Sequence, residues 1–455
     1  MSSPRTLRRV MGVPSLVIFG LAYMVPLTVF TTYGLVATTT GGHVPTAYIV
    51  TLIAMLFTAF SYAALVRVVP RAGSAYAYAR KAFGGHIGFL TGWSLMLDYL
   101  LLPLINYVLM GIYLNTQFPG VPGWVFALIG VIVITGLNIV GVTVLRNANL
   151  VLVGLQLLFA AVFVVSAVAY VSANPSASLL QPLYDAGLTL PGLVSGAAIL
   201  ALSFLGFDAI STLSEEARDP KRTVPRAIIL TTIIGGLIFV VISYLSSLVI
   251  PDIDDITNPD AAANQIMQVA GGRWLELFFL VSYIAGCIAA ALASQASVAR
   301  ILFAMGRDGV LPRRIFGVIS ERFRTPVGAS LFVGVVSLAA LVADLNTVAS
   351  LISFGALAAF SIVNLAVIKH FLIDEKRRGA AAILRYGVLP GLGVLLTAWL
   401  WFSLSGLALT VGLVWIGIGI LYLAVLTRGF RRRPPEVDFD ETDEPVRTPA
   451  HSATP

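Results

Sequence analysis

Hydrophobic and polar positions alternate in long blocks along the 455-residue chain, so that twelve apolar stretches are separated by polar loops. A stretch of about 20 apolar residues can cross the roughly 30 Å hydrocarbon core of a bilayer as a helix. The pattern therefore predicts an all-α integral membrane protein with 12 transmembrane helices. The predicted spans cover about residues 13–38, 46–66, 87–115, 122–141, 148–172, 191–216, 227–250, 273–300, 327–343, 348–369, 387–405 and 409–427.

The polar loops predict the orientation of these spans. If the spans alternate in direction, all of the 29 Lys and Arg residues except Arg273 fall on one side. Basic loops next to membrane spans stay in the cytoplasm, so we expect a multi-pass protein of the cell membrane with both termini cytoplasmic. Residues 1–12 would form a short tail and residues 13–428 the transmembrane domain. Residues 429–455 are rich in proline and acidic residues and are predicted to be disordered.

Composition excludes several other classes of protein. Hydrophobic residues make up 58% of the chain and charged residues 11%, a balance that does not suit a soluble fold of this length. The net charge of +7 is spread over many loops, so no nucleic-acid partner is expected. Cys287 is the single cysteine, and we expect no disulfide, metal site or cofactor. The sequence also lacks a Gly-rich phosphate loop, so we expect neither an enzyme nor an ATP-driven pump.

Two of the predicted spans contain helix-breaking residues at mid-membrane. Span one carries Gly20 and Pro26, and span six carries Gly206 followed by Asp208. Interrupted spans at matching positions of two halves are typical of transporters with inverted repeats. Spans one to five (about 13–172) and six to ten (about 191–369) would form such a 5+5 repeat, followed by two additional helices over 387–427. The alternative is that Pro26 only kinks its helix and Gly206 only permits close packing.

Acidic residues inside the membrane are the main candidates for chemistry. Asp98 lies eleven residues into span three, which is about 16 Å along a helix. No Lys or Arg lies at the centre of any span, so the Asp98 carboxylate is expected either to attract a cation or to carry a proton. The alternative is a protonated, hydrogen-bonded structural residue. Asp208 could likewise bind a ligand or cap the broken helix, and Tyr113 lies on the same face of span three as Asp98.

Several sequence motifs resemble those of the amino acid–polyamine–organocation transporters. The sixth span and the loop after it read Phe204-Leu205-Gly206-Phe207-Asp208-Ala209, Ser214-Glu215-Glu216 and Pro220-Lys221-Arg222-Thr223-Val224-Pro225-Arg226, and the loop after the eighth span reads Arg300-Ile301-Leu302-Phe303-Ala304-Met305-Gly306-Arg307-Asp308-Gly309. The resemblance covers about residues 10 to 428. Within the superfamily the chain resembles the bacterial putrescine importers, through Gly20-Leu21-Ala22-Tyr23, Gly42-His43-Val44-Pro45, Ala72-Gly73-Ser74-Ala75-Tyr76, Leu97-Asp98-Tyr99-Leu100, Ile112-Tyr113-Leu114 and Ala293-Ser294-Gln295-Ala296-Ser297.

This resemblance implies a LeuT-like fold with broken helices 1 and 6, and secondary active import of putrescine or a similar aliphatic polyamine by proton symport. The implied partners are a small cationic or zwitterionic amine, protons and the lipid bilayer. The substrate would lie between the two breaks and against span three. The implied substrate-binding residues are Ala22, Tyr23, Met24, Pro26, Asp98, Tyr113, Phe207 and Asp208, and the candidates for proton coupling are Asp98 and Glu216.

The sequence departs from related amino acid permeases in two places. Their first span usually carries a Gly-Ser-Gly-like turn that holds the carboxylate of the substrate, whereas residues 22–26 here read Ala-Tyr-Met-Val-Pro. The change suits a diamine, which has no carboxylate. Some proton-coupled relatives place a Lys in span five, and none is present here. An amino acid permease remains the alternative transport function, with sodium near Ser294 or Ser297 as the alternative coupling ion. A non-transporting membrane sensor or subunit is the alternative outside transport.

Overall fold

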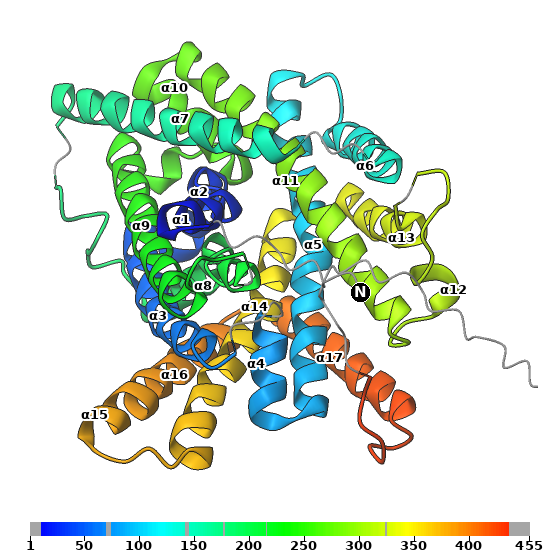
Figure 1. The fold of residues 1–455 in the computed structure, drawn as a ribbon. Helices are drawn as coiled ribbons and strands as arrows, with labels where there is room; N and C mark the ends of the chain where they lie inside the picture. The colour runs from blue at the N-terminus through cyan, green and yellow to red at the C-terminus, as the bar shows by residue number, and fades with distance from the viewer. Residues whose placement is uncertain are drawn as a thin grey trace, which may run out of the picture.

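The computed structural model describes residues 11–69, 74–141, 145–175, 178–214, 216–323 and 325–435 (Figure 1). In chain order, the helices and helical turns are α1 Val13–Met24, α2 Thr28–Thr40, α3 Val44–Val66, α4 Ser74–Phe83, α5 Gly85–Gln117, α6 Gly123–Val140, α7 Leu145–Ala173, α8 Leu190–Leu200, η1 Ala201–Phe204, η2 Ala209–Leu213, α9 Pro220–Val249, η3 Ile253–Asp255, η4 Pro259–Ala261, α10 Ala262–Gly271, α11 Arg273–Arg307, α12 Arg313–Phe316, α13 Val327–Ser337, η5 Leu338–Leu341, α14 Leu345–Ile368, η6 Lys369–Asp374, α15 Ala380–Ile383, η7 Leu384–Val388, α16 Leu389–Phe402 and α17 Gly406–Leu426.

The helices confirm an all-helical membrane protein. Within the described residues, ten helical segments are long and apolar enough to cross a bilayer, and the bent pair of α1 and α2 makes eleven. The segment Val327–Leu341 is apolar but shorter, so the expected count of twelve spans stays a prediction. The expected disorder of the C-terminal tail concerns mainly residues 436–455, which lie outside the described residues, as do residues 1–10 of the N-terminal tail and Glu215.

The expected break of span one is confirmed. Helix α1 ends at Met24, and the two helices α1 and α2 are bent by 46° relative to each other. Val25 adopts a φ of 48°, a left-handed conformation that β-branched residues rarely take. Pro26 follows without a backbone N–H, and the N–H of Thr28 donates to the carbonyl of Val25 at 2.8 Å. The sequence at Val25-Pro26 therefore ends one helix and starts the next.

The α-helix of the sixth predicted span is interrupted as well. Helix α8 tightens into the 3₁₀ turn η1, and Leu205 then takes an extended conformation. Gly206 follows with a φ of 131°, which L-residues rarely adopt. The chain resumes as the 3₁₀ turn η2 at Ala209. The interruption falls on the Gly-Phe-Asp stretch that the sequence analysis singled out.

The broken segments lie at the centre of the helix bundle. In Figure 1, α1, α2 and α8 lie together, with α3 and α9 on one side and α5, α11 and α14 on the other. Helices α15, α16 and α17 lie toward the periphery, and α4 packs against α5. Helix α14 packs both against α5, which carries Asp98, and against α8 and η1 of the sixth span.

Contacts between loops define two sides of the molecule. On the first, Met11 pairs with Ala217 and the C-terminal segment returns to the start of α5, where Pro434 lies beside Gly85. We call this the basic side. On the second, which we call the opposite side, the end of α5 meets the start of α11 through a hydrogen bond from Arg273 to Gln117.

Among the helices that lie between the predicted spans, α4 and α10 are the longest. Helix α4 follows the second span, and α10 lies in the Asp- and Asn-rich loop before α11. Both are short, with ten residues each. Neither is long enough to cross a membrane. Each therefore lies at one side of the membrane, and the order of the spans is unchanged.

Candidate functional site

The two broken segments touch each other through glycines. A Cβ at Gly206 would lie 2.9 Å from the backbone nitrogen of Met24 and 3.0 Å from the carbonyl oxygen of Gly20. A Cβ at Gly20 would in turn lie 2.6 Å from the side chain of Ile210. Both glycines are therefore required for the close approach of α1 to the interrupted sixth span. Met24 is buried within this contact, where it also packs against Gly235 of α9.

Asp208 stabilises the interruption of the sixth span. Its Oδ1 accepts a hydrogen bond from the N–H of Gly206 at 3.1 Å. Its backbone carbonyl accepts from the hydroxyl of Ser211 at 2.6 Å. The side chain is 6% exposed, so the carboxylate satisfies backbone groups that the missing helical turn leaves unpaired. The side chain satisfies the backbone before it and does not cap the start of η2.

Asp98 is also buried, with 3% exposure, but its surroundings differ from those of Asp208. Among the described residues, none donates a hydrogen bond to its Oδ1. Helix α14 passes directly beside it: a Cβ at Gly355 would lie 3.2 Å from the backbone nitrogen of Asp98, and the Ser94 hydroxyl donates to the Gly355 carbonyl at 3.3 Å. A buried carboxylate oxygen without a donor is costly unless a ligand or proton satisfies it.

Helix α14 also connects Asp98 to the sixth span. The hydroxyl of Ser353, two residues before Gly355, donates to the carbonyl of Ile199 near the end of α8 at 3.1 Å. One turn of α14 thus contacts both α5 at Asp98 and α8 just before the interruption. This contact fixes Asp98 relative to the interrupted segment.

Four polar side chains lie within electrostatic reach of one another at this point. The carboxylates of Asp98 and Asp208 interact with each other and with the hydroxyl groups of Tyr23 and Tyr99. Tyr23 comes from the last turn of α1, so spans one, three and six all contribute. Tyr99 belongs to the motif Leu97-Asp98-Tyr99-Leu100 and was not predicted as a site residue; its position next to Asp98 was the available signal.

The remaining residues predicted around the first break provide its walls. Ala22 is half-buried, and its carbonyl accepts a hydrogen bond from the N–H of Val25 at 3.3 Å. Pro26 is buried at the turn itself. These two residues shape the end of α1 rather than offering a charged group to a ligand.

Phe207 lies in an aromatic cluster behind the interruption. Its ring centroid is 5.7 Å from that of Tyr62 and 5.3 Å from that of Phe360, and the side chain is fully buried. Aromatic pairs at these distances stabilise packing. The cluster anchors the sixth span to α3 and α14, and in this conformation the ring packs on protein.

Tyr113 is not brought together with Asp98. The two residues are fifteen positions apart on α5, about 22 Å along the helix. Tyr113 is fully buried in a separate aromatic layer, with ring centroids 5.5 Å from Phe279 and 5.3 Å from Tyr283 of α11. A single diamine cannot contact Asp98 and this layer at the same time.

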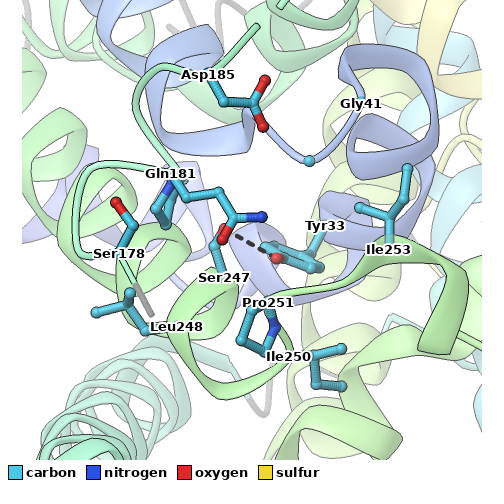
Figure 2. A pocket seen from close by; sticks show the side chains of 12 residues that line it. Tyr33, Gly41, Ser178, Gln181, Asp185, Ser247, Leu248, Ile250, Pro251 and Ile253 are labelled. Atoms are coloured by element: carbon cyan, nitrogen blue, oxygen red, sulfur yellow. Dashed lines mark hydrogen bonds between the residues drawn. The ribbon is translucent and has the colours of Figure 1, made fainter. Parts of the chain in front are cut away.

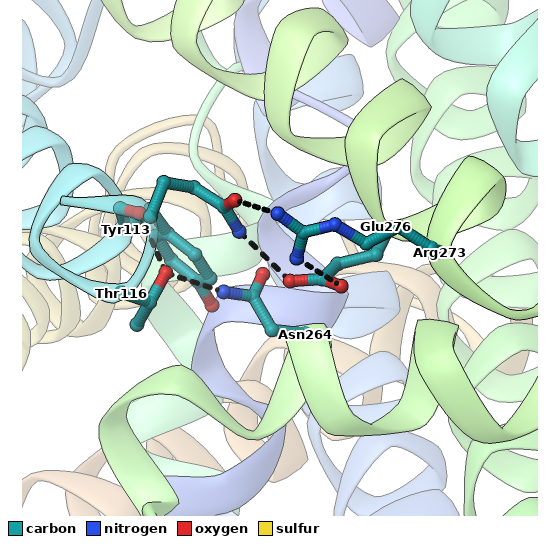
Figure 3. A network of polar contacts seen from close by, with 6 residues as sticks. Tyr113, Thr116, Asn264, Arg273 and Glu276 are labelled. Carbon is teal, nitrogen blue, oxygen red and sulfur yellow. Dashed lines mark hydrogen bonds and ion pairs between the residues drawn. The ribbon is translucent and has the colours of Figure 1, made fainter.

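A polar network covers this aromatic layer on the opposite side (Figure 3). The two oxygens of Glu276 accept hydrogen bonds from Gln117 at 2.8 Å and from Arg273 at 2.9 Å. Arg273 also donates to Gln117 at 2.6 Å, and Asn264 of α10 donates to Thr116 at 2.7 Å. The network connects the end of α5 to both α10 and α11.

Glu216 lies at the basic side, eight residues beyond Asp208 and half-buried. Its backbone carbonyl accepts a hydrogen bond from the N–H of Met11 at 3.0 Å, and the N–H of Arg218 donates to the carbonyl of Met11 at 3.1 Å. The structure therefore places Glu216 at a contact between the start of span one and the end of span six, apart from Asp98.

A small pocket opens near the opposite side between the end of α2, the segment before α8 and the end of α9 (Figure 2). Tyr33 donates a hydrogen bond to Ser247 at 2.9 Å beside it, and Asp185 and Gln181 line it. Its volume of about 20 Å³ suits a single water molecule rather than an organic substrate. Within the described part of the chain, no group of three His, Cys, Asp or Glu side chains could hold a metal ion.

Comparison with known proteins gives the family context of this geometry. Residues 15–426 match the sequence model of the family described as amino acid permease. The low-affinity putrescine importer PlaP of Escherichia coli is 41% identical over 436 residues, which cover 95% of this chain and 96% of that protein. Two Bacillus subtilis proteins, the branched-chain amino acid permease BcaP and a methylthioribose transporter, are each 27% identical over 94% of this chain and 95% of their own lengths.

Proposed function

The chain belongs to the amino acid permease family, and from this membership we propose that it imports putrescine or a similar aliphatic diamine across the cell membrane. It is thus a multi-pass membrane protein of a transporter family and not an enzyme. The relative with 41% identity over nearly the whole chain is named a putrescine importer, which supports an amine substrate.

The observation that carries the proposal is the pair of buried carboxylates beside the two breaks. Asp98 and Asp208 are each at most 6% exposed and interact electrostatically. No Lys or Arg lies at the centre of any predicted span to neutralise them. A substrate with ammonium groups supplies the missing positive charge. One ammonium group is held by Asp98 or Asp208.

The alkyl chain of the substrate lies against the end of α1. Tyr23 and Tyr99 offer aromatic faces for methylene and ammonium groups, and Ala22, Met24 and Pro26 form the wall of the first break. Phe207 contacts the substrate only if its ring leaves the packed position between Tyr62 and Phe360. Tyr113 acts from its separate layer, at a different stage of the transport path.

The architecture we propose is LeuT-like. Twelve spans comprise two inverted repeats, at about 13–172 and 191–369, and two additional helices over 387–427. The contact between the two interrupted segments supports this arrangement, because matching breaks of two repeats meet at the substrate site in such transporters. The basic side is cytoplasmic, so both termini are inside the cell.

Import is coupled to protons. A carboxylate inside the membrane can bind and release a proton during the cycle, because a low dielectric disfavours its charged form. Asp98, whose Oδ1 has no hydrogen-bond donor among the described residues, is the first candidate. Glu216 is the second; its position at the contact with Met11 favours a role in closing the basic side instead.

An amino acid permease is the second candidate function. The similarity to a branched-chain amino acid permease over 94% of the chain favours it. Residues 22–26 oppose it, because they lack the glycine-rich turn whose backbone N–H groups would hold a substrate carboxylate. Competition between labelled putrescine and a branched-chain amino acid separates the two functions.

The test is uptake of radiolabelled putrescine by the purified protein in liposomes. The parental protein should accumulate the label, and Asp98→Asn should take it up with an affinity lower by roughly a hundredfold to a few thousandfold, because removing one partner of a buried ion pair costs about 3–5 kcal/mol. Asp254→Asn makes the same change at an exposed position on the opposite side and should transport normally. If Asp98→Asn takes up putrescine with normal affinity, Asp98 has only a packing role. If the protein transports branched-chain amino acids and no putrescine, it is an amino acid permease.

A further inference from the structure

A cavity of about 260 Å³ opens on the opposite side, away from Asp98. It lies between the end of α5, the start of α6, η4 and the junction of η5 with α14. Its lining includes Ile112, Asn115, Trp124, Asp260 and Asp344, and most of the other lining residues are apolar or glycine. Asn115 is seventeen residues beyond Asp98 on α5, about 25 Å along the helix, so this cavity is separate from the proposed transport site.

The wall of the cavity is built by a close approach of two helices. A Cβ at Gly111 of α5 would lie 2.7 Å from the carbonyl oxygen of Gly123, and a Cβ at Gly123 would lie 3.0 Å from the carbonyl oxygen of Gly111. This contact fixes the first residues of α6 against α5. Trp124, the next residue, lines the cavity with half of its surface exposed. Its indole ring therefore remains available to a ligand.

The charge of the cavity is entirely negative. Among the described residues that line it, Asp260 and Asp344 are the only charged ones. Partial burial and the nearby charge of Asp344 raise the pKa of the Asp260 carboxyl. For Asp344 burial acts in the same direction, but hydrogen bonds from Thr347 outweigh it and lower the pKa of its carboxyl. Two neighbouring carboxylates with no basic residue in the lining concentrate cations.

A buried hydroxyl lies behind the wall that α5 contributes to the cavity. Tyr113 follows the lining residue Ile112 and is fully buried, and its hydroxyl has no hydrogen-bond partner within the described part of the chain. This hydroxyl lies within electrostatic reach of Asp260. A buried hydroxyl normally has a partner; Tyr113 packs against Phe279 and Tyr283 of α11 and is not one of the residues that line the cavity.

We infer that this cavity binds an aliphatic diammonium or polyammonium ion, with Asp260 and Asp344 holding its ammonium groups and Trp124 covering its alkyl chain. Indole rings attract ammonium ions through cation–π interactions, and two carboxylates match an ion that carries two separated charges. The inference goes beyond the proposed function, because binding here requires neither transport nor Asp98.

Equilibrium binding of radiolabelled putrescine to full-length Asp98→Asn protein tests the inference with the transport site disabled. Asp260→Asn and Asp344→Ser are added together; serine is also a good N-cap residue, so its hydroxyl can accept the hydrogen bond that the N–H of Thr347 donates to Asp344. Asp254→Asn, in the same loop but outside the cavity lining, is the matched control. We expect saturable binding in Asp98→Asn and in its Asp254→Asn derivative, and a loss of about tenfold in affinity in the Asp260→Asn/Asp344→Ser derivative. Trp124→Leu should weaken binding about threefold.

Two outcomes would overturn the inference. The first is putrescine binding that is unchanged by Asp260→Asn/Asp344→Ser, or equally weakened by Asp254→Asn. The second is complete displacement of the label by an equal concentration of magnesium, which would make the cavity a site for inorganic divalent cations. Failure of the proposed function has a different signature, since a protein that imports no putrescine would still show cavity binding that depends on Asp260 and Asp344.

Discussion

Asp98 and Asp208 are both buried carboxylates, but the chain uses them differently. Asp208 accepts a hydrogen bond from the backbone N–H of Gly206, whereas the Oδ1 of Asp98 has no donor among the described residues. A side chain that already satisfies the backbone has less need of a ligand than one that does not. Asp98 is therefore the residue whose ionised form depends most on a bound cation.

This difference predicts how Asp208 variants behave. Asp208→Asn retains an oxygen that can accept from Gly206, so the break should remain intact and only the charge is lost. Asp208→Ala removes the acceptor as well and should destabilise the protein by about 1–3 kcal/mol, because the buried N–H of Gly206 loses its partner. Thermal unfolding and putrescine uptake measure the two effects separately. Parental uptake in Asp208→Asn would show that the residue only accepts the hydrogen bond from Gly206.

Tyr113 offers a second test at the level of one residue. Because its hydroxyl has no hydrogen-bond partner among the described residues, Tyr113→Phe should leave the free energy of unfolding nearly unchanged. Tyr113→Ala removes the packing against Phe279 and Tyr283 and should lower that free energy by roughly 3 kcal/mol. Unfolding and uptake in both variants provide the measurement. Parental behaviour of Tyr113→Ala would mean that the aromatic layer contributes neither stability nor transport.

Single residues also show where sequence analysis reaches its limit. The helical period predicts Tyr113 and Asp98 near one face of α5, but it gives no information on which neighbouring helix each side chain contacts, and the two residues lie about 22 Å apart. The position of Tyr99 next to Asp98 was a signal for the site, but its electrostatic reach to Asp208 depends on how α5 and the sixth span are placed around α14. That placement has no signal in one sequence.

At the scale of elements, the contact between the two interruptions depends on glycine. Gly206→Ala would place a Cβ 2.9 Å from the backbone of Met24, at a φ of 131° that alanine rarely adopts. We expect this variant to separate the two segments and lose most putrescine uptake. Gly136→Ala in α6 is the matched control, because a Cβ there meets nothing within 4 Å. Equal uptake by both variants would argue against a functional contact between the breaks.

The positions of the helices were predictable to a greater extent than their contacts. Apolar length identified α3, α5, α9 and α17 to within a few residues at most ends, because spanning a bilayer imposes that length. The break at Val25 was predictable because Pro26 cannot continue a helix. Helix α10 was not, since ten residues in an acidic loop do not produce a pattern that distinguishes a short helix from a loop.

At the scale of the whole molecule, span one is held at both of its ends. On the basic side, Met11 exchanges two backbone hydrogen bonds with Glu216 and Arg218 after the sixth span. On the opposite side, Gly34 of α2 lies so close to η4 that a Cβ would be 2.1 Å from the carbonyl oxygen of Pro259. Any movement of span one that opens a path to the buried carboxylates must break one of these contacts.

The coupling ion is the last property to test, and it also belongs to the whole molecule. With no Lys in the fifth span, a proton-coupled cycle needs another group whose charge changes between the two conformations. We predict that an inward proton gradient, without sodium, drives putrescine accumulation in liposomes.

Glu216→Gln should still accumulate putrescine, because Glu216 lies at the contact on the basic side and Asp98 remains to carry the proton. Loss of accumulation with intact exchange in Glu216→Gln would instead assign coupling to Glu216. Uptake that requires sodium and ignores the pH gradient would contradict both assignments, and would direct attention to Ser294 and Ser297 of α11 as ligands for the ion.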